Sequence, residues 1–264
     1  MALTFIERCA VEDEGEGPVV VCVHGLGGSS NTFTPLMSAL ARHRVVRIDL
    51  PGSGRSHRAE GPLSMARYAD LVQSVCARLN VTRACFVGHS MGNIVLQHVA
   101  VQAPKLVAGL ALFGPLIVPP DGARSTIRAR GDKAKNEGAA GMHEIALALL
   151  SASISADTRA RLPLAVAFVR ESLMRQDPDD YARSCFALAD APAADVNRIE
   201  APVLLVTGDE DVVAPPQAVR SMAEKLHRAR SVRVVVLPKC GHWTPVERPE
   251  ECARELRGFL EAQR

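Results

Sequence analysis

The chain has 264 residues, of which 47% are hydrophobic and 23% are charged, and its net charge is +2. This composition is that of a globular protein with enough residues to bury a substantial core, as one large domain or two small ones. A net charge this close to zero gives no reason to expect nucleic acid or an anionic membrane as a partner.

The N-terminal part of the chain alternates short apolar runs with loops. The continuous apolar run at 18–23 suits a strand that is buried on both faces, as in a parallel sheet. The elements predicted for this part are a short strand at 4–11, an acidic turn at 12–17, strands at 18–23 and 44–48, a helix at 31–42, and loops at 24–28 and 49–56.

The next part continues the alternation. Ser64 is a suitable cap for a helix whose apolar residues share one face as far as Leu79. Residues 83–87 read as a buried strand, 93–100 as a helix that ends near Pro104, and 106–113 as a further strand. Strands that alternate with helices predict an α/β fold with a mostly parallel central sheet flanked by helices.

The pattern changes at Gly114. From there to about Arg198 we find helical periodicity and no convincing strand, and Asp177 before Pro178 is a good helix start. No flexible linker flanks this block. We therefore expect residues 115–198 to form a helical cap inserted into a core made of residues 1–114 and 199–264. The core resumes with strands at 202–207 and 231–237, a helix at 216–227 and a last helix from Pro249.

The stretch Gly88-His89-Ser90-Met91-Gly92 lies between a predicted strand and a predicted helix. In that setting the pattern Gly-x-Ser-x-Gly indicates a sharp turn that presents the serine hydroxyl as a nucleophile. The small residues let the strand and helix pass close together, and the N–H of Met91 points at whatever Ser90 attacks. A solvated serine in a glycine-rich turn is the alternative.

A serine hydroxyl is a poor nucleophile at neutral pH, so it needs a base, and the base needs an orienting acid. Asp211 and His242 each follow a predicted strand, and the carboxyl ends of parallel strands lie along one edge of a sheet. We expect both to converge on Ser90. Asp209 and Glu210 are rival acids, and His24 and His89 are rival bases. His89 is expected to be a wall of the pocket because the residue beside the nucleophile points away from it.

An oxyanion that develops during attack needs hydrogen-bond donors. The N–H groups of Met91 and Leu26 are the candidates, since the glycines around Leu26 allow close approach. A competing interpretation is a dinucleotide site, because Gly25-x-Gly27 precedes Asp49 by about twenty residues. The third glycine of that fingerprint is absent, and a nicotinamide enzyme would leave the serine, acid and base unexplained. We expect no cofactor and no metal, because no histidine or cysteine cluster has metal-ligand spacing.

Several features bear on location. The sequence contains no run of about 18 apolar residues, so we expect no transmembrane helix. Charged residues interrupt the N-terminal stretch too early for a signal peptide. The seven cysteines are scattered without a Cys-x-x-Cys pair, which suggests reduced thiols in the cytoplasm. Cys9, Cys22 and Cys85 fall on predicted strands and are expected to be small core residues.

Five ordered motifs together resemble the α/β-hydrolase family over nearly the whole chain. They are His24-Gly25, Asp49-x-Pro51-Gly52-x-Gly54-x-Ser56, Gly88-x-Ser90-x-Gly92, Gly208-x-x-Asp211 and Gly241-His242. Within that family the chain is most similar to the 3-oxoadipate enol-lactonase group, on the stretches 141–145 and 181–185. The segment 112–120 departs from that group's pattern, so the resemblance does not fix the substrate.

The resemblance implies a serine hydrolase core with a helical cap. Together with Ser90, His242, Asp211 and the Leu26 loop, it leads us to expect a hydrolase of carboxylic esters or lactones. Hydrolysis of a C–C bond or a lyase step on the same fold is the alternative, and a ligand-binding receptor with little turnover is a third hypothesis. An oxoadipate-type substrate would require a carboxylate-binding group, for which Arg124 and Arg128, with the nearby Arg130, are candidates. An exposed basic helix face is the other interpretation of these arginines.

Trp243 is the only tryptophan and directly follows the candidate base. It is expected either to line the pocket or to pack beneath the last helix.

Overall fold

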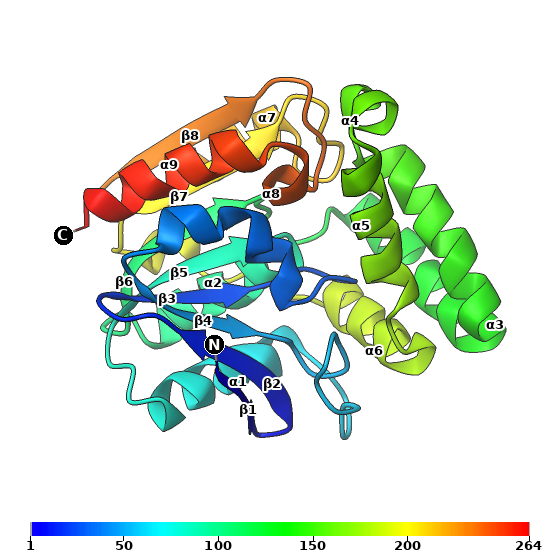
Figure 1. The fold of residues 1–264 in the computed structure, drawn as a ribbon, viewed down its shortest axis with the longest axis horizontal. Coiled ribbons are helices and arrows are strands. Elements are labelled where there is room, and N and C mark those ends of the chain that lie inside the picture. The colour runs from blue at the N-terminus through cyan, green and yellow to red at the C-terminus, as the bar shows by residue number, and fades with distance from the viewer. Residues whose placement is uncertain (1, 264) are drawn as a thin grey trace.

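A computed structural model describes residues 2–263 of the chain. Its strands are β1 (Ala2–Ile6), β2 (Cys9–Glu14), β3 (Val19–Val23), β4 (Arg44–Ile48), β5 (Ala84–His89), β6 (Val107–Phe113), β7 (Val203–Gly208) and β8 (Val232–Leu237). They form one sheet in the order β1-β2-β4-β3-β5-β6-β7-β8 (Figure 1). The six strands β4-β3-β5-β6-β7-β8 pair in parallel, and β1 and β2 form an antiparallel edge next to β4. The predicted α/β fold with a mostly parallel sheet is confirmed.

Helices cover both faces of the sheet. One face carries η1 (Ser30–Leu40) and α9 (Pro249–Glu261), with the short helix α8 (Thr244–Glu247) packed against both. The other face carries α1 (Met65–Arg78), α2 (Met91–Gln102) and α7 (Pro216–Lys225). Along β3, Val20 packs into the first layer and Val21 into the second. Alternate side chains of a strand point to opposite faces, so a strand covered on both sides is a continuous apolar run.

The N-terminal edge differs from the prediction. Instead of one strand at 4–11, the chain makes a hairpin of β1 and β2 whose turn residues Glu7 and Arg8 have φ values of 47° and 69°. Such a two-residue turn usually contains glycine or asparagine, so the charged pair hides it in the sequence. The expected turn at 12–17 begins later, because β2 extends through Glu14. The expected helix at 31–42 is the 3₁₀ helix η1, which contains Pro35.

Four helices join β6 to β7 and pack on one another beyond the carboxyl ends of the strands (Figure 1). They are α3 (Asp121–Ser153), α4 (Ala156–Arg161), α5 (Pro163–Met174) and α6 (Pro178–Ala189), followed by the 3₁₀ turn η2 (Val196–Arg198). We call α3 to α6 the helical block. As expected, Asp177 caps α6, accepting hydrogen bonds from the N–H groups of Asp179 and Asp180. Gly138, with φ of 59°, interrupts α3.

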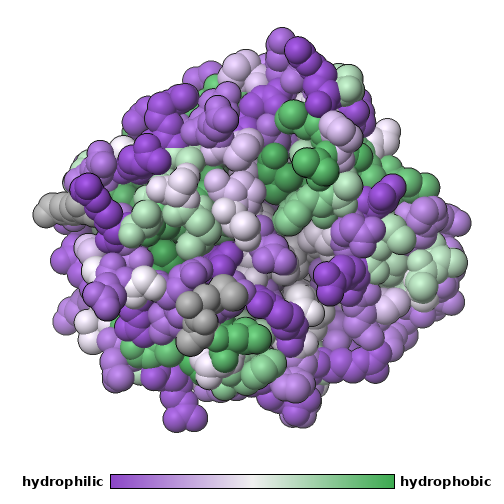
Figure 2. Space-filling view, in the orientation of Figure 1, coloured by the Kyte–Doolittle hydropathy of each residue, from purple (hydrophilic) through white to green (hydrophobic). Residues whose placement is uncertain are grey.

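The surface is hydrophilic over most of the face seen in Figure 2, with a hydrophobic patch near the start of α5. Leu164, in the first turn of α5, is 85% exposed. Within residues 2–263, no helix combines the length and apolarity that crossing a bilayer requires. All seven cysteines are buried and unpaired, including Cys9, Cys22 and Cys85 on their strands, as expected.

Candidate active site

Ser90 stands at the tight turn between β5 and α2. Its backbone has φ of 51° and ψ of −119°, a conformation that is costly for any residue with a side chain. The turn is compressed on both sides. A Cβ atom at Gly92 would lie 2.1 Å from the carbonyl oxygen of Val23, and one at Gly88 would lie 2.3 Å from Asn93 Oδ1. The glycines predicted to let strand and helix pass closely are therefore required by the packing.

The structure brings Ser90, His242 and Asp211 together in one hydrogen-bonded chain. His242 Nε2 lies 2.8 Å from Ser90 Oγ, and His242 Nδ1 lies 2.9 Å from Asp211 Oδ2. A carboxylate can only accept, so Nδ1 carries the proton and Nε2 is free to accept the serine hydroxyl. The imidazole is thereby held in the tautomer that a general base needs.

The carboxylate of Asp211 is fixed by its own loop. Its Oδ1 atom accepts hydrogen bonds from the N–H groups of Val213 and Ala214, both at 2.8 Å. Burial raises the pKa of Asp211, but the His242 imidazole and these N–H groups outweigh burial, so the pKa lies below its ordinary value. The rival acids Asp209 and Glu210 are exposed and accept from other backbone N–H groups.

His89 lies beside the chain of catalytic candidates and is not part of it. Its ring centroid is 5.2 Å from those of both His242 and Trp243. Its Nε2–H donates to the carbonyl oxygen of His242 at 3.0 Å. Burial, together with the nearby His242, lowers the pKa of His89 to about 3, so the ring is neutral. His89 thus lines the pocket as a neutral wall.

The two candidate oxyanion donors lie on facing backbone turns. Met91 is the first residue of α2, so its N–H has no partner within that helix. Leu26 is the second residue of a turn closed by a 3.0 Å hydrogen bond from Gly28 N–H to the Gly25 carbonyl oxygen. Within residues 2–263, the N–H of Leu26 has no acceptor. Both residues line the same cavity as Ser90.

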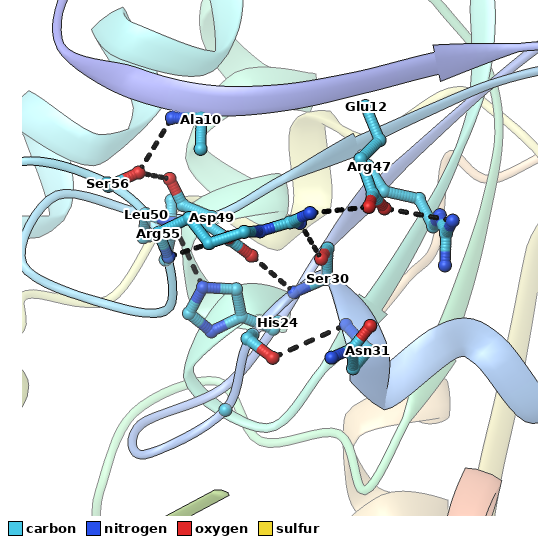
Figure 3. A network of polar contacts seen from close by, with 12 residues as sticks. Ala10, Glu12, His24, Ser30, Asn31, Arg47, Asp49, Leu50, Arg55 and Ser56 are labelled. Atoms are coloured by element: carbon cyan, nitrogen blue, oxygen red, sulfur yellow. Dashed lines mark hydrogen bonds and ion pairs between the residues drawn. The ribbon is translucent and has the colours of Figure 1, made fainter. Parts of the chain in front are cut away.

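A buried polar network holds the base of the Leu26 turn (Figure 3). The N–H of Leu50 donates to His24 Nε2 at 2.9 Å, so Nε2 is unprotonated and His24 Nδ1–H donates to the Gly25 carbonyl oxygen at 2.8 Å. Because the two polar ends of a trans peptide point in opposite directions, this bond turns the Leu26 N–H away from His24. Burial lowers the pKa of His24, in keeping with a neutral ring.

Asp49, the residue that suggested a dinucleotide site, is fully buried in this network. Its carboxylate accepts from the N–H of Ser30 at 2.6 Å and from the backbone and side chain of Arg55 at 3.0 Å (Figure 3). It is therefore not available to a ribose hydroxyl, and its role is to tie the loop after β4 to the loop after β3. Within residues 2–263, no group of three His, Cys, Asp or Glu side chains is placed to hold a metal ion.

A cavity of about 270 Å³ opens over Ser90 and His242. Its walls are mostly apolar, and its size suits a small organic ligand. The helical block supplies one side through Ile127, Leu149 and Leu188, and the segment after β6 supplies Leu116. Trp243 lines the cavity and is buried, which decides between its two expected positions.

The three candidate arginines occupy different places. Arg124 donates to the carbonyl oxygens of Ala189 and Ala191, and Arg128 pairs with Asp190, so neither side chain lines the cavity. Arg130 is half-buried and does line it, next to Tyr181. Within residues 2–263, no carboxylate lies within ion-pair distance of Arg130. It therefore brings a positive charge to a mostly apolar cavity.

Glu247 is a site residue that sequence reasoning missed. Its carboxylate is 1% exposed and accepts from the N–H groups of Gly241 at 3.0 Å, Trp243 at 3.0 Å and Ser155 at 2.9 Å. The N–H of His242 itself donates to the carbonyl oxygen of Ser153 at 2.7 Å. The candidate base is thus held on both sides, and the same contacts join its loop to the end of α3. One acidic residue in a short charged stretch carries no sequence signal of burial.

The profile of the alpha/beta hydrolase fold family matches residues 18–249. An (E)-2-((N-methylformamido)methylene)succinate hydrolase from Acinetobacter baylyi is 25% identical over 253 residues, which cover 94% of this chain and 92% of that protein.

Two solved structures are also similar. A thermophilic esterase from Thermogutta terrifontis, with malate bound, has a TM-score of 0.89 and 25% identity, over 97% of this chain and 93% of the other. An enol-lactonase from Burkholderia xenovorans has a TM-score of 0.87 and 25% identity, over 98% of this chain and 100% of the other.

Proposed function

This chain belongs to the α/β-hydrolase fold family, and on that basis we propose that it is a serine hydrolase of carboxylic esters or lactones. The observation that carries the proposal is the hydrogen-bonded chain from Ser90 through His242 to Asp211. Its three members come from the ends of three strands of one sheet, and this order of serine, acid and histidine along the chain is typical of the family.

In the proposed reaction, Ser90 Oγ attacks the carbonyl carbon while His242 Nε2 accepts the hydroxyl proton. Asp211 keeps the imidazole oriented and stabilises its charged form. The negative charge moves to the carbonyl oxygen, where the N–H groups of Leu26 and Met91 donate to it. Collapse of the tetrahedral intermediate breaks the C–O bond, and His242 returns the proton to the leaving alcohol. The acyl group remains on Ser90.

Water completes the cycle as the second nucleophile, and Ser90 is now the leaving group. His242 accepts a proton from water as the hydroxide attacks the acyl-enzyme, and it then returns that proton to Ser90 Oγ. With a lactone the leaving alcohol stays attached to the acyl group, so a single hydroxy acid is released. The small apolar cavity supports a substrate of modest size.

We further propose that the substrate carries a carboxylate that binds Arg130. An arginine that lines an apolar wall without an ion-pair partner favours an anion, and a carboxylate matches its planar donor geometry. The similar proteins support this choice, since one is named for a succinate derivative and another was solved with malate. The seven buried, unpaired cysteines support a reducing location, for which we propose the cytoplasm.

Hydrolysis of a short p-nitrophenyl ester and of an enol-lactone, by wild type and by Ser90→Ala, tests the proposed function. We expect wild-type turnover of at least one substrate and loss of that turnover in Ser90→Ala. The ratio of the two wild-type rates separates a general esterase from a lactonase. Turnover that survives in Ser90→Ala would refute the assignment, and wild type that cleaves a diketone but neither ester would identify a C–C hydrolase.

A further inference from the structure

Helix α5 of the helical block makes direct hydrogen bonds to the turn that carries Leu26. The hydroxyl of Ser172 donates to the carbonyl oxygen of Gly27 at 2.7 Å. The side-chain amide of Gln176, in the bend between α5 and α6, lies 3.3 Å from the carbonyl oxygens of both Gly27 and Gly28. The pairs are about 145 positions apart in sequence. The segment that carries Ser172 and Gln176 therefore holds the loop that follows β3 in place.

The orientation of the Gln176 amide follows from its surroundings. Its nitrogen also donates to the Ser172 carbonyl oxygen at 2.8 Å, so the three hydrogen-bond partners of that end are carbonyl oxygens, which can only accept. The NH₂ group must face the turn. Because Gln176 is only 6% exposed, water does not readily replace these bonds.

The turn is also pressed against α5. Gly27 has φ of +74°, the left-handed value required at the third position of this turn. A Cβ atom there would lie 2.4 Å from Leu173 Cδ2. The second residue of the turn, Leu26, lines the cavity, and its N–H has no acceptor within residues 2–263. The contact with Leu173 and the hydrogen bonds from Ser172 and Gln176 thus fix the Gly27 and Gly28 carbonyl groups, which follow Leu26 in the same turn.

We propose that Ser172 and Gln176 are positioning residues that hold the Gly25–Gly28 turn so that the Leu26 N–H is aimed at the developing oxyanion. The inference rests on the proposed function. It adds that the helical block sets the rate of the chemical step and not only the choice of substrate. Hydrogen bonds to an oxyanion stabilise the transition state more than the bound ester, so a loosened turn lowers kcat and leaves KM nearly unchanged.

The test compares wild type with Ser172→Ala, Gln176→Leu and the double variant on the p-nitrophenyl ester. We expect each single variant to lose roughly tenfold in kcat and the double variant up to about a hundredfold, the lower end of the range for complete loss of one oxyanion donor. KM should change less than about twofold. Ser172→Thr keeps the hydroxyl and should stay within about threefold of wild type. Ser221→Ala, an exposed serine on α7, is the matched control with wild-type kinetics.

Affinity for phenylboronic acid gives a second readout that does not need turnover. Boron accepts a lone pair from Ser90 Oγ, the serine proton passes to His242, and the tetrahedral adduct resembles the oxyanion intermediate. Binding can be followed by the fluorescence of Trp243, the only tryptophan, which lines the cavity. We expect affinity to fall by the same factor as kcat, with the melting temperature of the single variants within a few degrees of wild type.

The outcomes separate the two proposals. If Ser90→Ala is inactive but the double variant keeps wild-type kcat and boronate affinity, the positioning role is refuted and the proposed function stands. A rise in KM alone would also refute it, because that result indicates a binding contact. If wild type neither hydrolyses esters nor binds the boronate, the proposed function fails and the positioning role falls with it.

Discussion

His242 Nε2 lies 2.8 Å from Ser90 Oγ, although 152 positions separate the two residues in the sequence. The contact depends on the sheet, because β5 and β8 run parallel and release their loops at the same edge. It also depends on the surroundings of His242, whose backbone N–H donates to Ser153 and whose Nδ1–H donates to Asp211.

Asp211→Asn should lower kcat by about 10³–10⁴-fold with little change in KM. An asparagine that keeps the bonds to Val213 and Ala214 presents its NH₂ group to His242 Nδ1, which then must accept. The imidazole proton moves to Nε2, and the base can no longer accept from Ser90. Asp209→Asn, an exposed acid two positions away, is the control. Equal kcat values for the two variants would exclude Asp211 as the orienting acid.

Protonation of His89 should destabilise the folded protein at acidic pH. The pKa of His89 is about 3 in the folded state and about 6.5 when unfolded, so the unfolded chain binds the additional proton between these values. Stability therefore falls as the pH drops below about 6.5. From pH 7.5 to pH 5, this residue alone should cost about 2 kcal/mol of the free energy of unfolding.

Urea unfolding at pH 7.5 and pH 5 measures the effect of His89. His89→Gln can still donate to the His242 carbonyl oxygen. Between pH 7.5 and pH 5, its free energy of unfolding should fall by about 2 kcal/mol less than that of wild type. The exposed His227→Gln should match wild type at both pH values. The assignment is wrong if His89→Gln retains the wild-type pH dependence.

Arg130→Met should discriminate between charged and neutral substrates. For a p-nitrophenyl monoester of a dicarboxylic acid, we expect kcat/KM to fall roughly 10- to 100-fold, because a charge-assisted pair is lost. For the neutral ester of similar length, kcat/KM should change less than about threefold. Arg128→Met, which removes an arginine that pairs with Asp190 outside the cavity, is the control. An equal loss on both esters would argue against carboxylate binding.

Glu247→Gln should reduce both stability and kcat. The carboxylate accepts from three backbone N–H groups. In the glutamine variant one of the two oxygens becomes an NH₂ group, so at least one buried backbone N–H faces a donor and loses its hydrogen bond. We expect a loss of about 2–3 kcal/mol in the free energy of unfolding. Its exposed neighbour on α9 supplies the control Glu250→Gln. Urea unfolding and ester kinetics report the two effects, and wild-type stability would mean that the His242 loop does not depend on Glu247.

The sequence predicted the sheet and the meeting of Ser90, Asp211 and His242 because both follow from strong local signals. Apolar runs that end in glycine mark buried parallel strands, and polar residues directly after such runs must share an edge. The hairpin turn at Glu7 and Arg8 carried no such signal, since charged residues rarely adopt positive φ. The 3₁₀ geometry of η1 was likewise hidden, because its apolar face reads like that of an α-helix.

The contacts between distant segments could not be predicted. Ser172 and Glu247 are ordinary polar residues on short helices, and only the folded chain shows that one meets Gly27 and the other meets Ser155. The same limit applied to the arginines. Their sequence spacing did not reveal which would face the cavity, because that depends on how α3 rotates against α6.

The helical block leaves and re-enters the sheet between β6 and β7, which are neighbours in the sheet. An insertion at that junction leaves the order of the strands unaltered. The helical block can therefore be replaced by a different segment, which would change the substrates that the cavity accepts. The bonds from Ser172 and Gln176 to Gly27 set a condition on such grafts. A transplanted segment must bring its own donor to that carbonyl, and a chimera that lacks one would recognise a new substrate yet turn it over slowly.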